Sequence, residues 1–185
     1  MLRVGITGSI GSGKSTICSA FSLLLGVPVF SADDEAKIVF VNSTVEIKKE
    51  FGTYDPKELS SIVFRDKVKL EKLNSIIHPG VRARFEEWVK EYADHKYVLM
   101  EAAILFESGA DKFVDKIITV TAPVETRIAR VMKRNSISRE AVLDRMRNQM
   151  SDEDKIKRSD YVIINNDGPP PMRKIRKIHN ELIGI

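Results

Sequence analysis

Short runs of apolar residues recur along the chain, separated by longer segments in which apolar residues return every three or four positions. The short runs are rich in β-branched residues and apolar at nearly every position, which is typical of strands covered on both faces. They predict five strands, at 2–6, 27–30, 97–100, 117–121 and 161–164. Strands that alternate with helices favour an α/β fold with a parallel sheet and right-handed crossovers.

The intervening segments predict helices over 15–25, 66–94 and 172–183, and a further helix from Pro123 toward Arg134. Gly26 suits the end of the first helix. Within 66–94 the pattern is interrupted at Pro79. Because Pro79 lacks an amide hydrogen, we expect it to start a new helix or to kink the existing one.

The 185 residues fit a single domain. The stretch from about 42 to 95 is too long for one crossover helix, so we expect an inserted helical subdomain there. The core of the domain would then comprise about residues 1–41 and 96–185.

Residues 8–15 read Gly-Ser-Ile-Gly-Ser-Gly-Lys-Ser, which satisfies the pattern G-x-x-x-x-G-K-[ST] between a predicted strand and a predicted helix. The glycines let the backbone curl and turn its N–H groups toward a β-phosphate. Lys14 can reach the β and γ oxygens, and the hydroxyl of Ser15 can bind Mg²⁺. A glycine-rich turn that binds nothing is the alternative, but the strand before and the helix after it argue against that.

The loop therefore predicts binding of a nucleoside triphosphate, while the fate of the γ-phosphate stays open. The residues expected to bind the nucleotide are Gly8, Gly11, Ser12, Gly13, Lys14, Ser15 and Thr16.

Acidic residues follow two of the predicted strands, where an open α/β sheet places its ligands. Asp33, close to the end of the second strand, is the candidate base for phosphoryl transfer, or else the N-cap of a helix at 34–41. Glu101, after the third strand, could hold a magnesium-bound water, or be a buried, paired carboxylate. Glu107 is a weaker third candidate that could be a plain surface acid. No guanine-reading motif of the kind that GTPases carry is present.

Basic residues are concentrated between 127 and 147. The whole chain has 30 Lys+Arg and 26 Asp+Glu, a net charge of +4, which is too mild to imply a nucleic-acid partner. Arg127, Arg130 and Arg134 share one helical face. A lid at about 134–150 whose arginines neutralise the γ-phosphate is one interpretation, and a solvated basic face is the other.

Composition also bears on the compartment. The single cysteine, Cys18, cannot form an internal disulfide, which favours a reducing compartment. No apolar run approaches the roughly 20 residues that span a bilayer, and the N-terminus lacks the features of a signal peptide. We therefore expect a cytoplasmic protein with no membrane partner.

Over nearly its whole length the sequence resembles the dephospho-CoA kinases. The motifs that carry the resemblance are Gly-x-x-Gly-Ser-Gly-Lys-Ser-Thr at 8–16, Ser-Ala-Asp at 31–33, Ile-Val-Phe at 62–64, Leu-Asn-x-Ile-x-His-Pro at 73–79, Leu-Phe-Glu at 105–107, Arg130 with Arg134, Arg145 with Gln149, and Arg158-x-Asp-Tyr-Val-Ile-x-Asn at 158–165. The phosphate loop alone is generic, and its combination with the other motifs is specific.

The resemblance implies phosphorylation by ATP of the ribose 3′-hydroxyl of dephospho-coenzyme A, the last step of coenzyme A synthesis, with Mg²⁺. It implies a three-layer P-loop kinase fold: a five-stranded parallel sheet, a helical substrate-binding insertion and a lid that bears arginines. The roles it implies are catalysis by Lys14, Asp33 and Arg145, ATP binding by the loop and Arg134, and binding of the coenzyme by Asp33, His78, Arg82, Glu101 and Leu105.

Three positions depart from the family pattern. Ser31 replaces the first aspartate of Asp-Ala-Asp, so that carboxylate is not essential or its role has moved. Residues 102–104 are Ala-Ala-Ile where Val-Pro-Leu is common, and Arg127 stands where the family often has Gln. Lys14, Ser15 and Asp33 remain, so we expect activity to survive.

Two other functions compete with this one. A kinase of another small nucleotide or metabolite would have the same sheet, loop and lid, with a different acceptor pocket. A nucleic-acid-dependent ATPase or regulatory switch would use the basic segment as its contact, but that segment lacks the interleaved aromatic residues that stack on bases. We therefore expect a small-molecule substrate, no nucleic-acid partner, and a monomer or weak homo-oligomer.

Overall fold

The computed structural model describes residues 1–63 and 66–184. The chain forms two compact units, one made of Met1–Phe30 and Tyr92–Ile185, the other of Ser31–Glu91. The insertion expected at about 42–95 overlaps the second unit, which begins earlier, at Ser31, and ends earlier, at Glu91. Phe64, the last residue of the motif at 62–64, lies outside the described residues.

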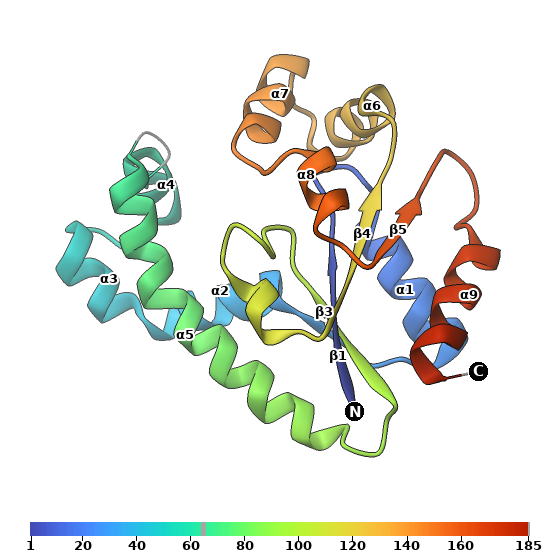
Figure 1. Cartoon of the computed structure of the whole chain (residues 1–185). Helices are drawn as coiled ribbons and strands as arrows, with labels where there is room; N and C mark the ends of the chain where they lie inside the picture. Colours follow the sequence, from blue (N-terminus) through green and yellow to red (C-terminus); the bar gives the residue numbers. More distant parts are fainter. Residues whose placement is uncertain (64–65, 185) are drawn as a thin grey trace. The chain divides into compact units, whose positions relative to one another are not determined.

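A five-stranded, all-parallel sheet has the order β2-β3-β1-β4-β5 (Figure 1). Its strands are β1 (Leu2–Thr7), β2 (Val29–Ser31), β3 (Tyr97–Glu101), β4 (Lys116–Thr121) and β5 (Tyr161–Ile164). β1 is central, with Val4 beside Leu99 of β3 and Ile6 beside Ile118 of β4. The predicted parallel sheet is confirmed, although β2 begins at Val29, two residues later than expected. The carbonyl of the preceding Pro28 accepts from the amide of Leu99.

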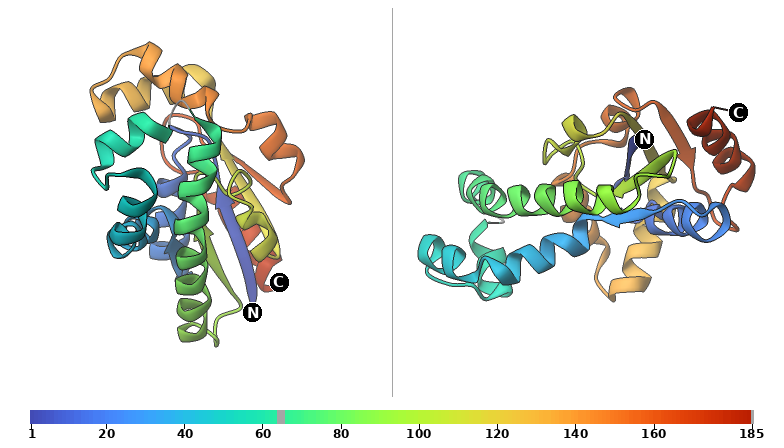
Figure 2. Two further views of the ribbon diagram at one scale, coloured as in Figure 1. Left: turned by 90° about the vertical axis from the view of Figure 1, so that its left-hand side faces the viewer. Right: turned by 90° about the horizontal axis from the view of Figure 1, so that it is seen from below.

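One face of this sheet is covered by α1 (Lys14–Leu25) and α9 (Met172–Ile183), which lie side by side (Figure 2). Both helices have the predicted range to within one residue, and Gly26 ends α1 in the left-handed region, at φ 66°. Apolar side chains from alternate strand positions meet apolar side chains of both helices here. This cluster includes Val4, Ile6, Ile17, Phe21, Leu99, Ile118, Val120, Ile163, Ile175 and Ile178.

The opposite face carries the intervening strand positions and is covered by the segment after β3 and by α8 (Asp152–Lys157). A Cβ at Gly5 of β1 would lie 2.8 Å from a methyl group of Leu105, so glycine leaves room here for the Leu105 side chain. A short 3₁₀ turn, η1 (Ala110–Phe113), leads from here toward β4. Helices and loops thus cover both faces, as a parallel sheet requires.

The predicted basic segment forms a helical hairpin of α6 (Val124–Asn135) and α7 (Arg139–Arg147). Its small core consists of Ile128, Val131 and Val142. Ile10 of the phosphate loop packs against this core. The hairpin is therefore attached to the loop by apolar contact as well as by the chain.

The second unit contains α2 (Ala32–Asn42), α3 (Thr44–Phe51), α4 (Pro56–Val63) and α5 (Lys67–Glu91). Its core is built from one buried residue of each of the last three helices, Ile47, Leu59 and Leu73. None of the helices within 1–63 and 66–184 has the length and apolar character that a membrane span needs.

The expectation that Pro79 starts a new helix is wrong, because α5 runs through it as one helix of 25 residues. Proline removes only one donor, and the contact between α2 and α5 supports the helix at this point. A Cβ at Gly80 would lie 2.7 Å from a methyl group of Val39, so the two helices touch where the proline falls. The ion pair of Arg84 with Glu35 joins the same two helices.

Candidate active site

The phosphate loop connects the end of β1 to the start of α1. Gly13 precedes α1 with φ 82°, a left-handed conformation that favours glycine. A Cβ at Gly13 would also collide with the amide nitrogen of Asn165, which donates to the carbonyl of Ser12 at 3.0 Å. Asn165 directly follows β5, so the segment after the last strand contacts the phosphate loop.

Lys14 and Ser15 converge on one acid. The ammonium of Lys14 lies 2.6 Å from Oε1 of Glu101, and the hydroxyl of Ser15 donates to the same oxygen at 2.7 Å. Glu101 is the last residue of β3, the neighbour of β1, which explains why its carboxylate reaches the loop. The Lys14 and Glu101 side chains are only 10% and 12% exposed. Glu101 is therefore a paired carboxylate, and its partners are the two residues that a magnesium-organising acid would need beside it.

Cys18 follows Lys14 by one helical turn. Burial and the negative charge of Glu101 raise the pKa of its thiol, so the group stays protonated at neutral pH.

Arg130 of α6 holds the loop from its outer side. Its guanidinium donates to the carbonyls of Gly11 and Ser12 at 3.4 and 3.5 Å, and to the carbonyl of Asn165 at 3.1 Å. It also pairs with Asp167 at 3.1 Å. The carbonyls of the loop are thus bound by a cation, which leaves the opposite side of the backbone to face an anion.

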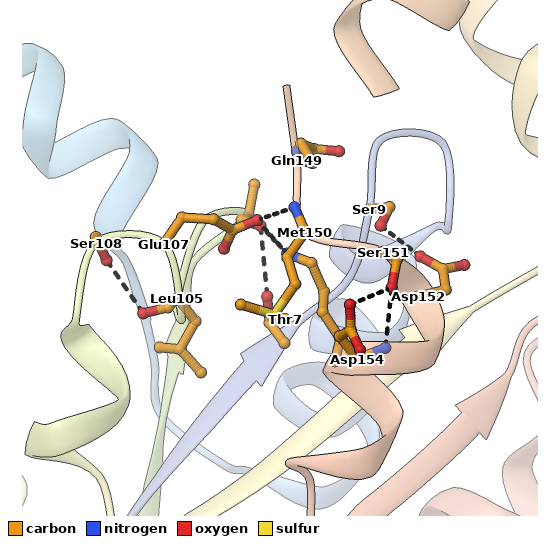
Figure 3. Close-up of polar contacts among 12 residues, drawn as sticks. Thr7, Ser9, Leu105, Glu107, Ser108, Gln149, Met150, Ser151, Asp152 and Asp154 are labelled. Atoms are coloured by element: carbon orange, nitrogen blue, oxygen red, sulfur yellow. Dashed lines mark hydrogen bonds and ion pairs between the residues drawn. The ribbon is translucent and has the colours of Figure 1, made fainter. Parts of the chain in front are cut away.

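Arg127, one turn before Arg130, is buried and pairs with Asp152 at 3.2 Å. The helical spacing indicated that Arg127 belongs to an anion-binding face with Arg130 and Arg134. The structure shows instead that Arg127 is buried and paired. Asp152 also accepts from the hydroxyl of Ser9 in the phosphate loop (Figure 3). A second hydroxyl, that of Thr121 at the end of β4, donates to the same carboxylate. Next to it, the side-chain oxygen of Gln149 accepts from the amide of Ile10 at 2.8 Å.

Two buried side-chain atoms have no hydrogen-bond partner within the described part of the chain: Oγ of Ser12 and Nε of Arg127. Ser12 is 1% exposed and belongs to the phosphate loop. A buried hydroxyl without a partner is costly unless something else satisfies it, so the loop suits a polar ligand.

Glu107 is not a plain surface acid. Its carboxylate lies 2.9 Å from the ammonium of Lys155, a residue with no exposed surface, and accepts from the amide of Met150 at 2.8 Å (Figure 3). The same ammonium donates to the carbonyl of Ala103 at 3.0 Å.

The remaining arginines of the hairpin are exposed. Arg134 donates to the side chain of Asn135, so the residue of this family motif that contacts the phosphate loop is Arg130. Arg139 forms a two-bond ion pair with Glu125 at 2.7 Å. Arg145 makes no ion pair or hydrogen bond with the residues that the structure describes.

Three of the expected site residues belong to the second unit. Asp33 is exposed in the first turn of α2, whose N-cap is Ser31: the hydroxyl of Ser31 accepts from the amide of Asp34 at 3.3 Å. The alternative that Asp33 caps this helix is therefore wrong. His78 and Arg82 lie one turn apart on α5, with His78 half-buried and Arg82 exposed. Burial lowers the pKa of His78.

Leu105 is fully buried beneath Gly5. Thr16, in contrast, is exposed in the first turn of α1. Among the described residues, no group of three or more His, Cys, Asp or Glu side chains could hold a metal ion.

The sequence did not single out Ser9, Asp152 or Lys155 as parts of this site. Gln149 and Asn165 stand in motifs of the family resemblance, but no role was expected for them. Nothing in the local pattern marks a lysine such as Lys155 as buried, because its partners are far away in the sequence.

The first strand of the parallel sheet leads directly into this glycine loop. A lysine and a serine of the loop meet an acid from the neighbouring strand at one point. Together these features define a P-loop nucleotide-binding protein of the kinase type. A family model described as dephospho-CoA kinase matches residues 2–170. The chain belongs to the dephospho-CoA kinase family.

Relatives and solved structures agree with this assignment. Dephospho-CoA kinase of Fusobacterium nucleatum is 40% identical over 176 residues, with 90% of each chain covered. That of Bacteroides fragilis is 38% identical over 182 residues, covering 92% of this chain and 87% of the relative. The structure of the Campylobacter jejuni enzyme has a TM-score of 0.70 at 28% identity, covering 98% of this chain and 97% of that one. Shikimate kinase of Acinetobacter baumannii, at 16% identity and a TM-score of 0.54 over 100% and 94% of the two chains, shares the fold.

Proposed function

We propose that this chain transfers the γ-phosphoryl group of ATP to the ribose 3′-hydroxyl of dephospho-coenzyme A. The observation that carries the proposal is the convergence of Lys14 and Ser15 on Glu101 at the end of β3, in a chain of this family. Transfer of a phosphoryl group requires positioning and charge neutralisation more than covalent chemistry, and this point supplies a cation, a hydroxyl and an acid.

We assign ATP to the phosphate loop. The backbone N–H groups from Gly8 to Ser15 would bind the β-phosphate at the positive end of α1, and Lys14 would exchange Glu101 for β and γ oxygens. The unpartnered hydroxyl of Ser12 supports an anion here. Arg134 and Thr16, both exposed, are kept as proposed ATP contacts.

The residues present suit Mg²⁺. Ser15 would bind the ion directly and Glu101 would orient a water bound to it, because Mg²⁺ keeps several waters and takes few protein ligands. The bound ion would neutralise charge on the β- and γ-phosphates.

We propose Asp33 as the general base. It would accept the proton of the ribose 3′-hydroxyl while that oxygen bonds to the γ-phosphorus and the bond to the ADP oxygen breaks. Its exposure supports the assignment, as does the cap of α2 at Ser31, which leaves the Asp33 carboxylate out of the capping role. His78 and Arg82 are proposed to bind the coenzyme, Arg82 through a phosphate.

Arg145 is the proposed lid arginine. It is exposed on α7, whereas its neighbours Arg139 and Arg147 are paired with acids. A guanidinium that reaches the γ-phosphate during transfer would stabilise the charge that develops there.

For partners we propose small molecules only, with the protein a monomer or weak homo-oligomer. The cytoplasm is the proposed location, since ATP is required and the single cysteine is a buried thiol.

An acceptor panel tests the proposal. ADP release from magnesium-ATP is measured with no acceptor, with dephospho-coenzyme A, with adenosine, with shikimate and with RNA. We expect release that depends on dephospho-coenzyme A alone. Release that depends on another acceptor would assign a different small-molecule kinase, and stimulation by RNA with steep salt dependence would assign a nucleic-acid-dependent ATPase.

A further inference from the structure

Lys155 is a charged residue buried without any exposed surface, on α8. Its ammonium has two acceptors, the carboxylate of Glu107 at 2.9 Å and the carbonyl of Ala103 at 3.0 Å. A buried ion pair adds little stability, because the loss of hydration offsets the attraction of the charges. The location of this pair therefore calls for a reason other than stability.

Glu107 also contacts a second segment, at Met150. The carboxylate oxygen that binds Lys155 also accepts from the amide of Met150 (Figure 3). Lys155 thus fixes the side chain of Glu107, and Glu107 fixes the backbone at Met150. Arg158 contacts the segment after β3 that bears Glu107: its guanidinium lies over the ring of Phe106, 4.3 Å from the ring centre.

Met150 lies in a short segment, 149–152, that we call the strap. On its other side the strap holds the phosphate loop: Gln149 accepts from the amide of Ile10, and Asp152 accepts from the hydroxyl of Ser9. The strap begins just after α7, which bears Arg145. It therefore also connects the helical hairpin to the phosphate loop.

We propose that Lys155 and Glu107 are positioning residues for the nucleotide: through the amide of Met150 they hold the strap against the phosphate loop. Neither residue touches the substrate. The loop binds phosphate by backbone groups that must point inward before the ligand arrives, so a strap that is released costs nucleotide affinity and turnover. The inference deepens the proposed function, because it acts on the same site.

Two double variants separate positioning from structure. Lys155→Met with Glu107→Gln removes the ion pair but keeps a carbonyl oxygen for the amide of Met150. Lys155→Met with Glu107→Leu removes both the ion pair and the oxygen that accepts from the amide of Met150. Because apolar replacement of a buried pair is often neutral, we expect both to melt within about 3 °C of the wild type. Lys116→Met, which removes a surface pair with Asp160, is the control.

The readouts are the Kd of magnesium-ADP by calorimetry and the kcat and KM of turnover. We expect the Leu variant to bind magnesium-ADP about tenfold more weakly and to lose a similar factor in kcat/KM for ATP, with the KM for the acceptor within about twofold of the wild type. The Gln variant should lose about threefold, because its amide keeps the contact with Met150 but is no longer held by Lys155, and the control should stay within about twofold of the wild type.

Equal nucleotide Kd values for the Leu and Gln variants would overturn the inference. If the Leu variant does not fold, Gln149→Ala tests the same strap from the side that holds the phosphate loop, and an unchanged Kd for magnesium-ADP would overturn the inference equally. Nucleotide binding is measured without the acceptor. A wild type that binds magnesium-ADP but leaves dephospho-coenzyme A unchanged would therefore contradict the proposed function and leave this test valid.

Discussion

The carboxylate of Glu101 lies 2.6 Å from the ammonium of Lys14, where the end of β3 meets the phosphate loop. Ser15 donates to the same oxygen. We expect a triphosphate that enters the loop to draw Lys14 away from this acid, which would leave the carboxylate next to the hydroxyl proposed to bind Mg²⁺. The pair would then link nucleotide binding to the organisation of the metal.

Glu101→Gln tests this link. A neutral amide cannot orient a magnesium-bound water as well as a carboxylate, so kcat should fall about 10- to 100-fold. The Kd of ADP without Mg²⁺ should stay the same or tighten, because no acid competes for Lys14. Calorimetry and steady-state kinetics measure the two effects. Glu153→Gln on the exposed side of α8 is the control, and an unchanged kcat in Glu101→Gln would remove Glu101 from the reaction.

Asp33→Asn tests the proposed base. We expect kcat to fall about 100-fold or more, while the Kd of magnesium-ATP stays within about twofold. Asp34→Asn is a matched control, because Asp34 is the next residue of the same helical turn and pairs with Lys37 at 2.6 Å. Full turnover in Asp33→Asn would show that another group accepts the proton.

Arg145→Ala tests the lid. If the guanidinium acts mainly during transfer, kcat should fall about 100-fold or more and the Kd of ATP should change far less. Arg147→Ala, two residues further on and paired with Asp144 at 2.5 Å, should leave both values near the wild type. An unchanged kcat in Arg145→Ala would place this residue outside the closed site.

Stability should decrease as the pH falls from 7.5 to 5.5. Burial lowers the pKa of both His78 and His179 below the ordinary value of 6.5. In this range the unfolded chain therefore binds more protons than the folded one, and acid favours unfolding. The His179 ring lies 2.9 Å from the hydroxyl of Tyr97, and His78 is half-buried on α5.

Thermal melts at the two pH values measure this effect. The double variant His78→Gln and His179→Gln should lose most of the pH dependence. The same slope in the variant as in the wild type would assign the effect to other groups.

Much of the fold could be predicted from the sequence, because strands buried on both faces leave near-continuous β-branched runs. β5 and α9 have the predicted ranges. The new helix that could have started at Pro79 does not form, and the contact between Gly80 and Val39 that supports α5 joins two distant segments.

The candidate site was predictable where its residues are close in sequence or follow a strand. The phosphate loop has its fixed spacing, and Glu101 its place at the end of β3. The strap and the buried Lys155 depend on contacts across 48 to 143 residues, from Lys155 to Glu107 and from Ser9 to Asp152. No local pattern records such contacts, and the buried position of Arg127 depends likewise on Asp152.

We have proposed that the chain phosphorylates the ribose of dephospho-coenzyme A. The most direct test is to incubate the protein with magnesium-ATP and dephospho-coenzyme A and to analyse the product by mass and by phosphorus NMR, with Lys14→Ala as the inactive control. We expect a product heavier by one phosphate, carrying a 3′-monoester and absent with Lys14→Ala. An acceptor of unchanged mass, or a product formed equally by the Lys14→Ala variant, would contradict it.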